Sequence, residues 1–464
     1  MEVLKPYLKY KTSGISWLGN IPEHWEVKRI KYIFQEQDKR SKTGLESLLS
    51  VSHYTGVTQK SDKVASGEMM TNAKTLIGYK IVEKDDLVIN IMLAWNGSLG
   101  ISKFNGITSP AYCVYKSLIG GERYFGYLFR TKNAQQEFKK QSTGIIESRL
   151  RLYSDKFFNI KIVVPTDEEQ TAIANFIDFK TEKIERFIRK KKHLIKLLNE
   201  QKDGIINDAV TKGVNLNVKT KSSGIEWLKN IPKHWEVKKL KYLVSLNDET
   251  LNEKTDPQYE LRYVDIGNVN EDGEIAEIVN YKFKDAPSRA KRIVKKDDVI
   301  ISTVRTYLKA ITQIQDDCQD LIVSTGFAVL RPKCISSNFL NFSVRANYFI
   351  QKVCAESFGV SYPAINASEL VNLEIALTDI TEQIAIVFHI EKETAILNKT
   401  IATIEKEIVL VQEYQTTIIA EAVTGKIDLR DYELPISVKE DEEVEEELGM
   451  ASEEEAEYQN QEAE

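Results

Sequence analysis

The chain has 464 residues, 42% of them hydrophobic, and a formal net charge of −6. It contains no apolar run of about 18 residues, which excludes a membrane-spanning helix, and its first residues lack the apolar core of a signal peptide. The four cysteines, Cys113, Cys318, Cys334 and Cys354, show no CxxC spacing. We therefore expect a cytoplasmic protein that has neither a disulfide framework nor a metal site.

The negative charge is concentrated at the end of the chain. Residues 440–464 contain 13 Asp or Glu residues and no Lys or Arg, and the remaining chain has 63 basic against 56 acidic residues. The acidic segment has few apolar residues, so we expect it to be disordered and to act as a solubilising extension; the alternative is that it competes with an anionic ligand. A body that is basic overall permits nucleic-acid binding without establishing it.

Taken in order, the chain first shows a motif that occurs twice. Residues 11–32 read KTSGISWLGNIPEHWEVKRIKY, and residues 221–242 read KSSGIEWLKNIPKHWEVKKLKY, with 16 of 22 positions identical. Later pairs keep the register, such as EQTAI at 169–173 and EQIAI at 382–386. The chain is therefore an internal duplication of two domain-sized units. Because both copies carry the HW pair, we interpret its tryptophan as a core anchor and its histidine as structural.

Each unit is predicted to be an α+β domain with short, β-branched strands. The predicted strands of the first domain are 48–51, 87–92, 111–115 and 160–164, with a helix at 122–141. Those of the second are 261–266, 299–304, 327–330 and 373–377, with a helix at 338–356. The paired acids at 85–86 and 297–298 predict a turn before a strand, because adjacent strand residues point to opposite faces and do not converge on a metal ion.

A long helix follows each domain, with Thr166 and Thr378 as the candidate N-caps. The apolar residues of each helix alternate in steps of four and three, which is a heptad seam. The seam residues are Ile177, Ile184, Ile188, Ile195, Leu198 and Ile205 in the first helix, and Ile390, Leu397, Ile401, Ile404, Ile408, Val411 and Ile418 in the second. Neither helix can bury its seam alone, so we expect the two helices to pair.

Connectivity predicts the direction of this pairing. The first helix leads from the first domain to the second, so a second helix that pairs with it must run back. We therefore expect antiparallel coiled-coil helices with the domains at opposite ends, in a circular arrangement with a pseudo-two-fold axis. A reader with two-fold symmetry matches the half-sites of DNA at a set spacing.

The doubled SGIxWLxNIPxHWEVKxxKY motif, the EQxAI helix start and the AVT helix end resemble the specificity subunit of bacterial Type I restriction–modification systems. The resemblance covers nearly all of residues 11–430. It implies two target recognition domains at 1–166 and 213–378, each reading half of a bipartite DNA site. It also implies two conserved spacer helices, at 167–212 and 379–425. The acidic tail of the C-terminal extension at 426–464 departs from the family pattern and lies outside the resemblance.

The resemblance further implies the partners of the chain. They are double-stranded DNA, two modification subunits that methylate adenine, and restriction subunits that cleave. We expect S-adenosylmethionine, ATP and Mg on these partner subunits and no cofactor on this chain. The sequence has no [DN]PP[YF] motif, no suitable G-x-G loop and no GxxxxGK[ST] loop, so we expect no catalytic residues.

Candidate DNA-binding residues lie in loops that differ between the two copies and carry basic, amide or aromatic side chains. In the first domain they are Lys39, Arg40, Lys42, Trp95, Asn96, Arg149 and Arg151. In the second they are Arg289, Lys291, Arg292, Arg305, Tyr307, Lys309 and Tyr362. Trp95 and Tyr307 follow equivalent strands and are candidates for stacking on, or wedging between, bases.

Two alternatives belong to other functional classes. A coiled-coil scaffold holding two protein-binding domains would explain the helices and the duplication, but not the basic divergent loops. A methyltransferase or nuclease in its own right is disfavoured by the missing motifs. DNA affinity in the presence of modification subunits, and activity in their absence, distinguish the three functions.

Overall fold

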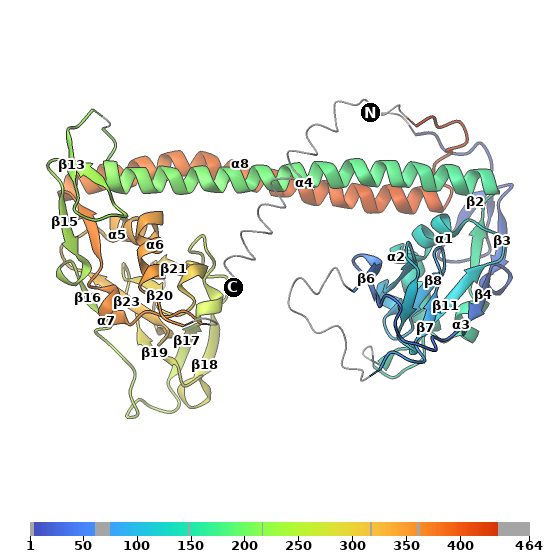
Figure 1. Ribbon diagram of the computed structural model, residues 1–464, viewed down its shortest axis with the longest axis horizontal. Coiled ribbons are helices and arrows are strands. Elements are labelled where there is room, and N and C mark those ends of the chain that lie inside the picture. The colour runs from blue at the N-terminus through green and yellow to red at the C-terminus, as the bar shows by residue number, and fades with distance from the viewer. Residues whose placement is uncertain are drawn as a thin grey trace. The chain divides into compact units, whose positions relative to one another are not determined.

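The computed structural model describes residues 4–60, 75–146, 149–215, 217–315, 318–359 and 362–434, so the acidic segment 440–464 lies outside the described residues. The chain divides into two compact units. One consists of residues 1–189 with 408–464, and the other of residues 190–407. Each unit therefore combines one α+β domain with one half of each long helix (Figure 1).

The first domain is built on a four-stranded antiparallel sheet. Its strand order is β4 (Phe34–Gln37), β11 (Tyr112–Ser117), β8 (Leu87–Asn90) and β9 (Leu99–Ile101). All four residues of β8 are buried, as its unbroken apolar run LVI predicts. The helices α1 (Glu122–Phe129), α2 (Lys132–Gln141) and α3 (Ser154–Asn159) contribute buried aromatic rings to the same core, among them Phe125, Phe138 and Phe157.

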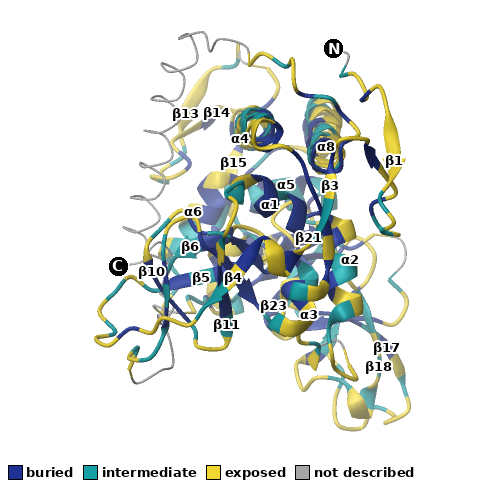
Figure 2. Cartoon of the chain, turned by 90° about the vertical axis from the view of Figure 1, so that its right-hand side faces the viewer, coloured by how far each residue is buried: buried dark blue, intermediate teal, exposed yellow. Residues whose placement is uncertain are grey.

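Four two-stranded pairs complete the first domain. They are β1 (Tyr10–Thr12) with β2 (Asn20–Pro22), β3 (Glu26–Arg29) with β12 (Lys161–Val164), β5 (Leu49–Ser52) with β6 (Gly56–Gln59), and β7 (Lys80–Val82) with β10 (Gly106–Thr108). The β3–β12 pair joins the start of the domain to its end. Strand β1 is exposed along its whole length, as its yellow colour in Figure 2 shows.

The second domain repeats this plan. Its equivalent sheet has the order β16 (Val244–Leu246), β23 (Phe327–Pro332), β20 (Val299–Ser302) and β21 (Ile311–Gln313). The pairs β13 (Thr220–Ser222) with β14 (Asn230–Pro232), and β15 (Glu236–Lys239) with β24 (Glu374–Leu377), match those of the first domain. The helices are α5 (Ser337–Arg345), α6 (Asn347–Ala355) and α7 (Ala367–Leu370).

The second domain has a second four-stranded sheet, in the place of the pairs β5–β6 and β7–β10, which a parallel bridge between Leu48 and Ile107 links in the first domain. The order is β18 (Val279–Lys282), β17 (Glu260–Val264), β22 (Leu321–Ser324) and β19 (Ala290–Ile293), with β17 and β22 parallel. Every predicted strand overlaps an observed one. Each predicted domain helix is wrong in extent, because it is two helices in the structure. In the first domain the break lies at Thr131, whose hydroxyl accepts a hydrogen bond from the Ala134 amide at 3.3 Å and so begins α2.

The long helices α4 (Asp167–Lys212) and α8 (Ile380–Val423) confirm the two predicted helices, which the sequence places at 167–212 and 379–425 (Figure 1). They run antiparallel within each unit. In the first unit, Ile173 and Ile177 near the start of α4 share a core with Ile418 near the end of α8. In the second unit, Ile206 near the end of α4 shares a core with Ile386 near the start of α8. The fold is therefore α+β, with two similar domains and two long antiparallel helices.

The paired acids form turns before strands, as predicted. Asp86 accepts a hydrogen bond from the Glu83 amide at 2.8 Å, and Asp298 accepts one from the Lys295 amide at the same distance. The preceding aspartates adopt the same left-handed backbone conformation in both copies, with φ 71°. The two turns differ in one contact, because Asp298 also receives two hydrogen bonds from the guanidinium of Arg331, each 2.9 Å long.

Candidate nucleic-acid interface

Two segments that are distant in sequence meet beside the central strand of the first domain. The loop after β8 contains a 3₁₀ turn, η3 (Ala94–Asn96), and the second segment covers residues 142–146 and 149–152. The Leu152 amide donates to the Ile91 carbonyl at 2.9 Å, which fixes the second segment beside the loop. Thr143 and Arg151 exchange two backbone hydrogen bonds of 2.9 Å, so the second segment folds back on itself and presents Arg149 and Arg151 to solvent.

The second domain brings the equivalent segments together in the same way. The loop after β20 contains η8 (Thr306–Leu308), and the Ile365 amide donates to the Thr303 carbonyl beside it at 2.9 Å. Phe358 and Ala364 are paired across the returning segment. We call the two meeting segments of each domain its interface loops: residues 91–98 with 142–146 and 149–152, and residues 303–309 with 357–359 and 362–365.

Contacts between the interface loops of the second domain place two of the predicted residues together. The Arg305 guanidinium lies 4.6 Å from the centre of the Tyr362 ring, and the Arg305 amide donates to the Pro363 carbonyl at 2.7 Å. The side chains of Arg305, Tyr307 and Tyr362 are exposed. A guanidinium stacked on an aromatic ring is held in a fixed orientation, which suits it to contact base edges or phosphate.

In the first domain the side chain of Trp95 packs against the protein. Trp95 is half-buried, its indole N–H donates to the Met92 carbonyl at 3.1 Å, and the Lys139 amine lies 5.3 Å from its ring. Asn96 is also half-buried and accepts a hydrogen bond from the Ser98 hydroxyl at 3.0 Å. Of the two aromatic residues predicted to follow equivalent strands, Tyr307 is thus the exposed one.

The other predicted residues lie outside the segments that form the interface loops, and some of them have protein partners. Lys39 is 3.1 Å from Glu83, and Arg40 is 2.9 Å from Asp38. Lys42 is exposed beside them. Arg289 is exposed just before β19, whereas Lys291 and Arg292 are half-buried within that strand.

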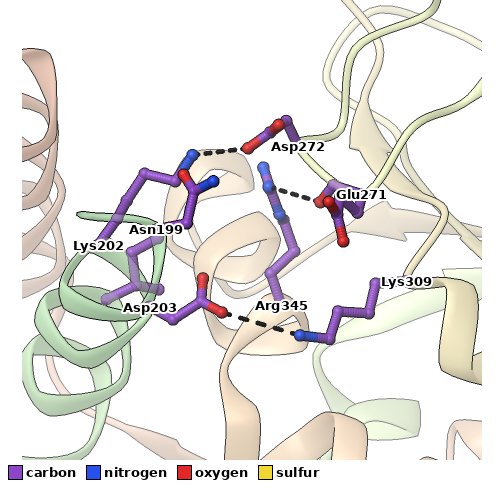
Figure 3. A pocket seen from close by; sticks show the side chains of 8 residues that line it. Asn199, Lys202, Asp203, Glu271, Asp272, Lys309 and Arg345 are labelled. Carbon is purple, nitrogen blue, oxygen red and sulfur yellow. Dashed lines mark hydrogen bonds and ion pairs between the residues drawn. The ribbon is translucent and has the colours of Figure 1, made fainter. Parts of the chain in front are cut away.

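Lys309 belongs to the interface loops but points toward α4. Its amine lies 3.8 Å from Asp203, at a pocket that is also lined by Lys202, Asp272 and Arg345 (Figure 3). Lys202 is 2.6 Å from Asp272 in the turn before β18, and Arg345 donates to the Glu271 carbonyl at 3.2 Å. These contacts attach the second domain to α4.

A repeated cluster of side chains, which the sequence patterns did not predict, holds each domain to its long helix. Glu169 in the first turn of α4 is buried and accepts hydrogen bonds from the Trp25 indole at 3.2 Å and the Tyr7 hydroxyl at 2.9 Å, while a ring nitrogen of His24 lies 2.9 Å away. Burial acts to raise the pKa of the Glu169 carboxyl, but the hydrogen bonds from His24, Trp25 and Tyr7 outweigh it, so this pKa is lowered.

The second copy of this cluster uses equivalent residues. Glu382 in the first turn of α8 accepts a hydrogen bond from the Trp235 indole at 3.0 Å and lies 2.9 Å from a ring nitrogen of His234. Thr378 donates its hydroxyl to Glu382 and is not the N-cap. That prediction was wrong, because the Asp379 carboxylate accepts from the amide of residue 381 at 2.9 Å. The HW pair and the EQxAI motif therefore bond to each other. The signal for this contact was present in the sequence, since both motifs recur together.

The predicted seam residues are all buried or half-buried. Ile177, Ile184, Ile390, Ile404, Ile408 and Ile418 are buried, and Ile188, Ile195, Leu198, Ile205, Leu397, Ile401 and Val411 are half-buried. Other apolar residues of α8 face solvent instead, including Ile384, Phe388 and Ile396, which are 60%, 68% and 62% exposed. This outer face of α8 is available to a partner.

The part of the chain that the structure describes contains no group of three or more His, Cys, Asp or Glu side chains that could hold a metal ion. Within the same residues, no helix is long and apolar enough to cross a membrane.

The chain is similar in sequence to known proteins. Residues 232–408 match the family model described as the Type I restriction modification DNA specificity domain. The Type I restriction enzyme MjaVIII specificity subunit of Methanocaldococcus jannaschii is 26% identical over 427 residues, which cover 88% of this chain and 94% of the relative.

The fold also matches a solved chain. The solved chain comes from a study of complex assembly and conformational transition of the type I R-M system, and it matches the present chain with a TM-score of 0.60 at 14% identity. The match covers 88% of this chain and 99% of that one. At this identity the match establishes the fold alone.

Proposed function

We propose that this chain, which belongs to the family of Type I restriction–modification specificity subunits, recognises DNA by reading a bipartite target with its two domains. Each domain reads one half-site through its interface loops. The two halves differ in sequence because the loops carry different side chains, Arg149 and Arg151 in one domain and Arg305 and Tyr362 in the other.

One observation carries this proposal. The same two segments meet at the same place in both domains, held by equivalent backbone hydrogen bonds at Leu152 and Ile365, although their side chains differ. A constant framework that presents variable basic and aromatic side chains is what base readout requires. A scaffold for two protein partners has no such need for exposed arginines.

The long helices have two functions in this proposal. They set the spacing between the half-sites, and they dock two modification subunits that methylate adenine. The exposed Ile384, Phe388 and Ile396 of α8 support the docking role, because apolar side chains in a row on one helix favour a protein partner. Restriction subunits join the complex when cleavage occurs.

The chemistry is assigned to the partner subunits. S-adenosylmethionine serves the modification subunits, and ATP and Mg serve the restriction subunits, while this chain positions them on DNA. Such a complex acts on chromosomal and incoming DNA, so we place it in the cytoplasm.

A domain exchange tests the proposal. Residues 33–165 are replaced by the corresponding segment of a relative, and the chain is produced with its modification subunits. Sequencing of methylated adenines should show one changed half-site and one unchanged half-site. A change in both halves would show that the domains are not independent readers. Methylation by the chain without modification subunits would instead favour an enzyme.

A further inference from the structure

The turn between β5 and β6 exposes two aromatic rings that none of the roles above explains. Tyr54 is 80% exposed, and the centre of its ring lies 3.6 Å from that of His53. The two rings are tilted by 41° and in contact, which limits the rotation of the tyrosine, so its ring is presented to solvent in a restricted set of orientations. Tyrosine has an apolar ring and a polar hydroxyl, which is why such side chains are enriched at interfaces with partners.

The backbone of this turn is held by a side chain from the end of α1. The Arg130 guanidinium donates to the His53 and Tyr54 carbonyls, both at 2.8 Å. Burial lowers the pKa of Arg130. Gly56 has φ +70°, and a Cβ there would lie 2.6 Å from the guanidinium, so a glycine is required for this approach. The turn is therefore preorganised rather than free to adapt.

This turn adjoins the interface loops of the first domain. Gly56 packs against Gly100 in β9, where an added Cβ would lie 3.3 Å from the Gly56 Cα. Strand β9 begins directly after the loop that contains η3. The Gln135 amide donates to the Arg130 carbonyl at 2.9 Å, and the same side chain covers Gly97 in that loop. The aromatic turn and the loop that contains η3 are thus held next to each other in the fold.

The second domain uses its corresponding turn differently. Arg345 donates to the Glu271 carbonyl at 3.2 Å, and Gly273 has φ +80° beside the guanidinium, which repeats the arrangement of Arg130 and Gly56. The turn itself carries Glu271 and Asp272, and Asp272 bonds to Lys202 of α4 (Figure 3). Carboxylates repel phosphate, and in the second domain Asp272 binds Lys202 of α4 instead. The turn between β5 and β6 of the first domain carries no acidic residue.

We infer that Tyr54, supported by His53, contacts the DNA of the first half-site by placing its ring in a groove against the bases. The inference rests on the proposed function. An aromatic ring can unstack a base step partially or pack on a thymine methyl group, and both contacts add affinity without needing a hydrogen bond. The second half-site has no equivalent contact from the turn at 270–273.

The test uses the full chain in complex with its modification subunits, and a duplex with the target deduced from methylated adenines. Tyr54→Ala should weaken binding about tenfold, whereas Tyr54→Phe, which keeps the ring, should bind like wild type. The loss should persist when the second half-site is scrambled and disappear when the first is scrambled. Tyr32→Ala removes a tyrosine of the same unit that is 60% exposed and should leave affinity unchanged.

Three results would overturn the inference. Wild-type affinity in Tyr54→Ala would show that the ring does not contact DNA. Loss of modification subunits from the Tyr54→Ala complex would assign the ring to a protein contact. A wild-type complex that binds target and scrambled duplexes equally would overturn the proposed function together with this inference.

Discussion

The Trp25 indole donates a hydrogen bond to the buried carboxylate of Glu169 at 3.2 Å, and Trp235 and Glu382 repeat this bond at 3.0 Å. Each bond joins a motif near the start of a domain to the first turn of the helix that follows the domain. It therefore closes each domain onto its helix, which explains why both motifs recur in the duplication.

We predict that Glu169→Gln destabilises the protein by about 2 kcal/mol, because Tyr7 and Trp25 lose a charged acceptor in a buried site. Urea unfolding of the chain measures the change. Glu168→Gln alters the exposed neighbouring residue and is the matched control. Equal stability of the two variants would contradict a structural role for the Glu169 cluster.

The same carboxylate predicts a pH dependence. Because the folded-state pKa of Glu169 is lowered below the usual 4.5, the charged form stabilises the fold. This contribution is fully present above the unfolded-state pKa and is lost as the pH falls through the folded-state pKa. The difference in unfolding free energy between wild type and Glu169→Gln should be constant near neutrality and shrink below about pH 4.5. A difference that grows on acidification would contradict this sign.

Asp298→Asn should cost more stability than Asp86→Asn. Both carboxylates accept an amide hydrogen bond at 2.8 Å, but only Asp298 is joined by two hydrogen bonds to a guanidinium, that of Arg331. Losing a buried ion pair costs about 3 kcal/mol, against about 1 kcal/mol for a neutral hydrogen bond. The two variants are compared by thermal unfolding, and equal losses would show that the ion pair contributes little.

Arg305→Ala should weaken binding to the second half-site about tenfold, since its guanidinium is held against Tyr362 on the interface loops. Lys309→Ala is the control from the same loop, because that amine faces Asp203 of α4. Fluorescence anisotropy with duplexes scrambled in one half-site at a time measures both variants. A larger loss of DNA affinity in Lys309→Ala than in Arg305→Ala would show that Lys309, and not Arg305, contacts the DNA.

Inserting four residues near Lys196 of α4 should lengthen the spacer between half-sites. The insertion adds about one helical turn, roughly 6 Å, which corresponds to one or two base pairs at about 3.4 Å each. The extra turn can partly loop out beside the unchanged α8, which would reduce the shift. A two-residue insertion rotates the seam by about 200° and should give an inactive or insoluble complex. The consensus of methylated sites reads out each variant. An active four-residue variant with a helical insertion and an unchanged spacer would show that the helices do not set the spacing.

The sequence by itself determined the features that depend on local order. The steps of four and three in α4 and α8 reveal helices because the period belongs to the backbone, and the seam residues Ile177 and Ile390 are buried accordingly. The duplication reveals two similar domains, since two copies of one sequence share one fold. Apolar runs such as that of β8 mark buried strands for the same local reason.

Only the tertiary structure decided which distant residues meet. The motifs of Trp25 and Glu169 recur together, but no periodicity shows that these two side chains bond, and none links residue 152 to the loop after β8, because each contact forms when a chain of many residues closes on itself. The tertiary structure also gives different contacts to residues with the same charge. Lys309 and Arg305 are four residues apart and both cationic, yet one bonds to a helix carboxylate and the other stacks on an exposed ring. Side-chain direction at such positions follows from packing across the fold, to which a single sequence gives no local signal.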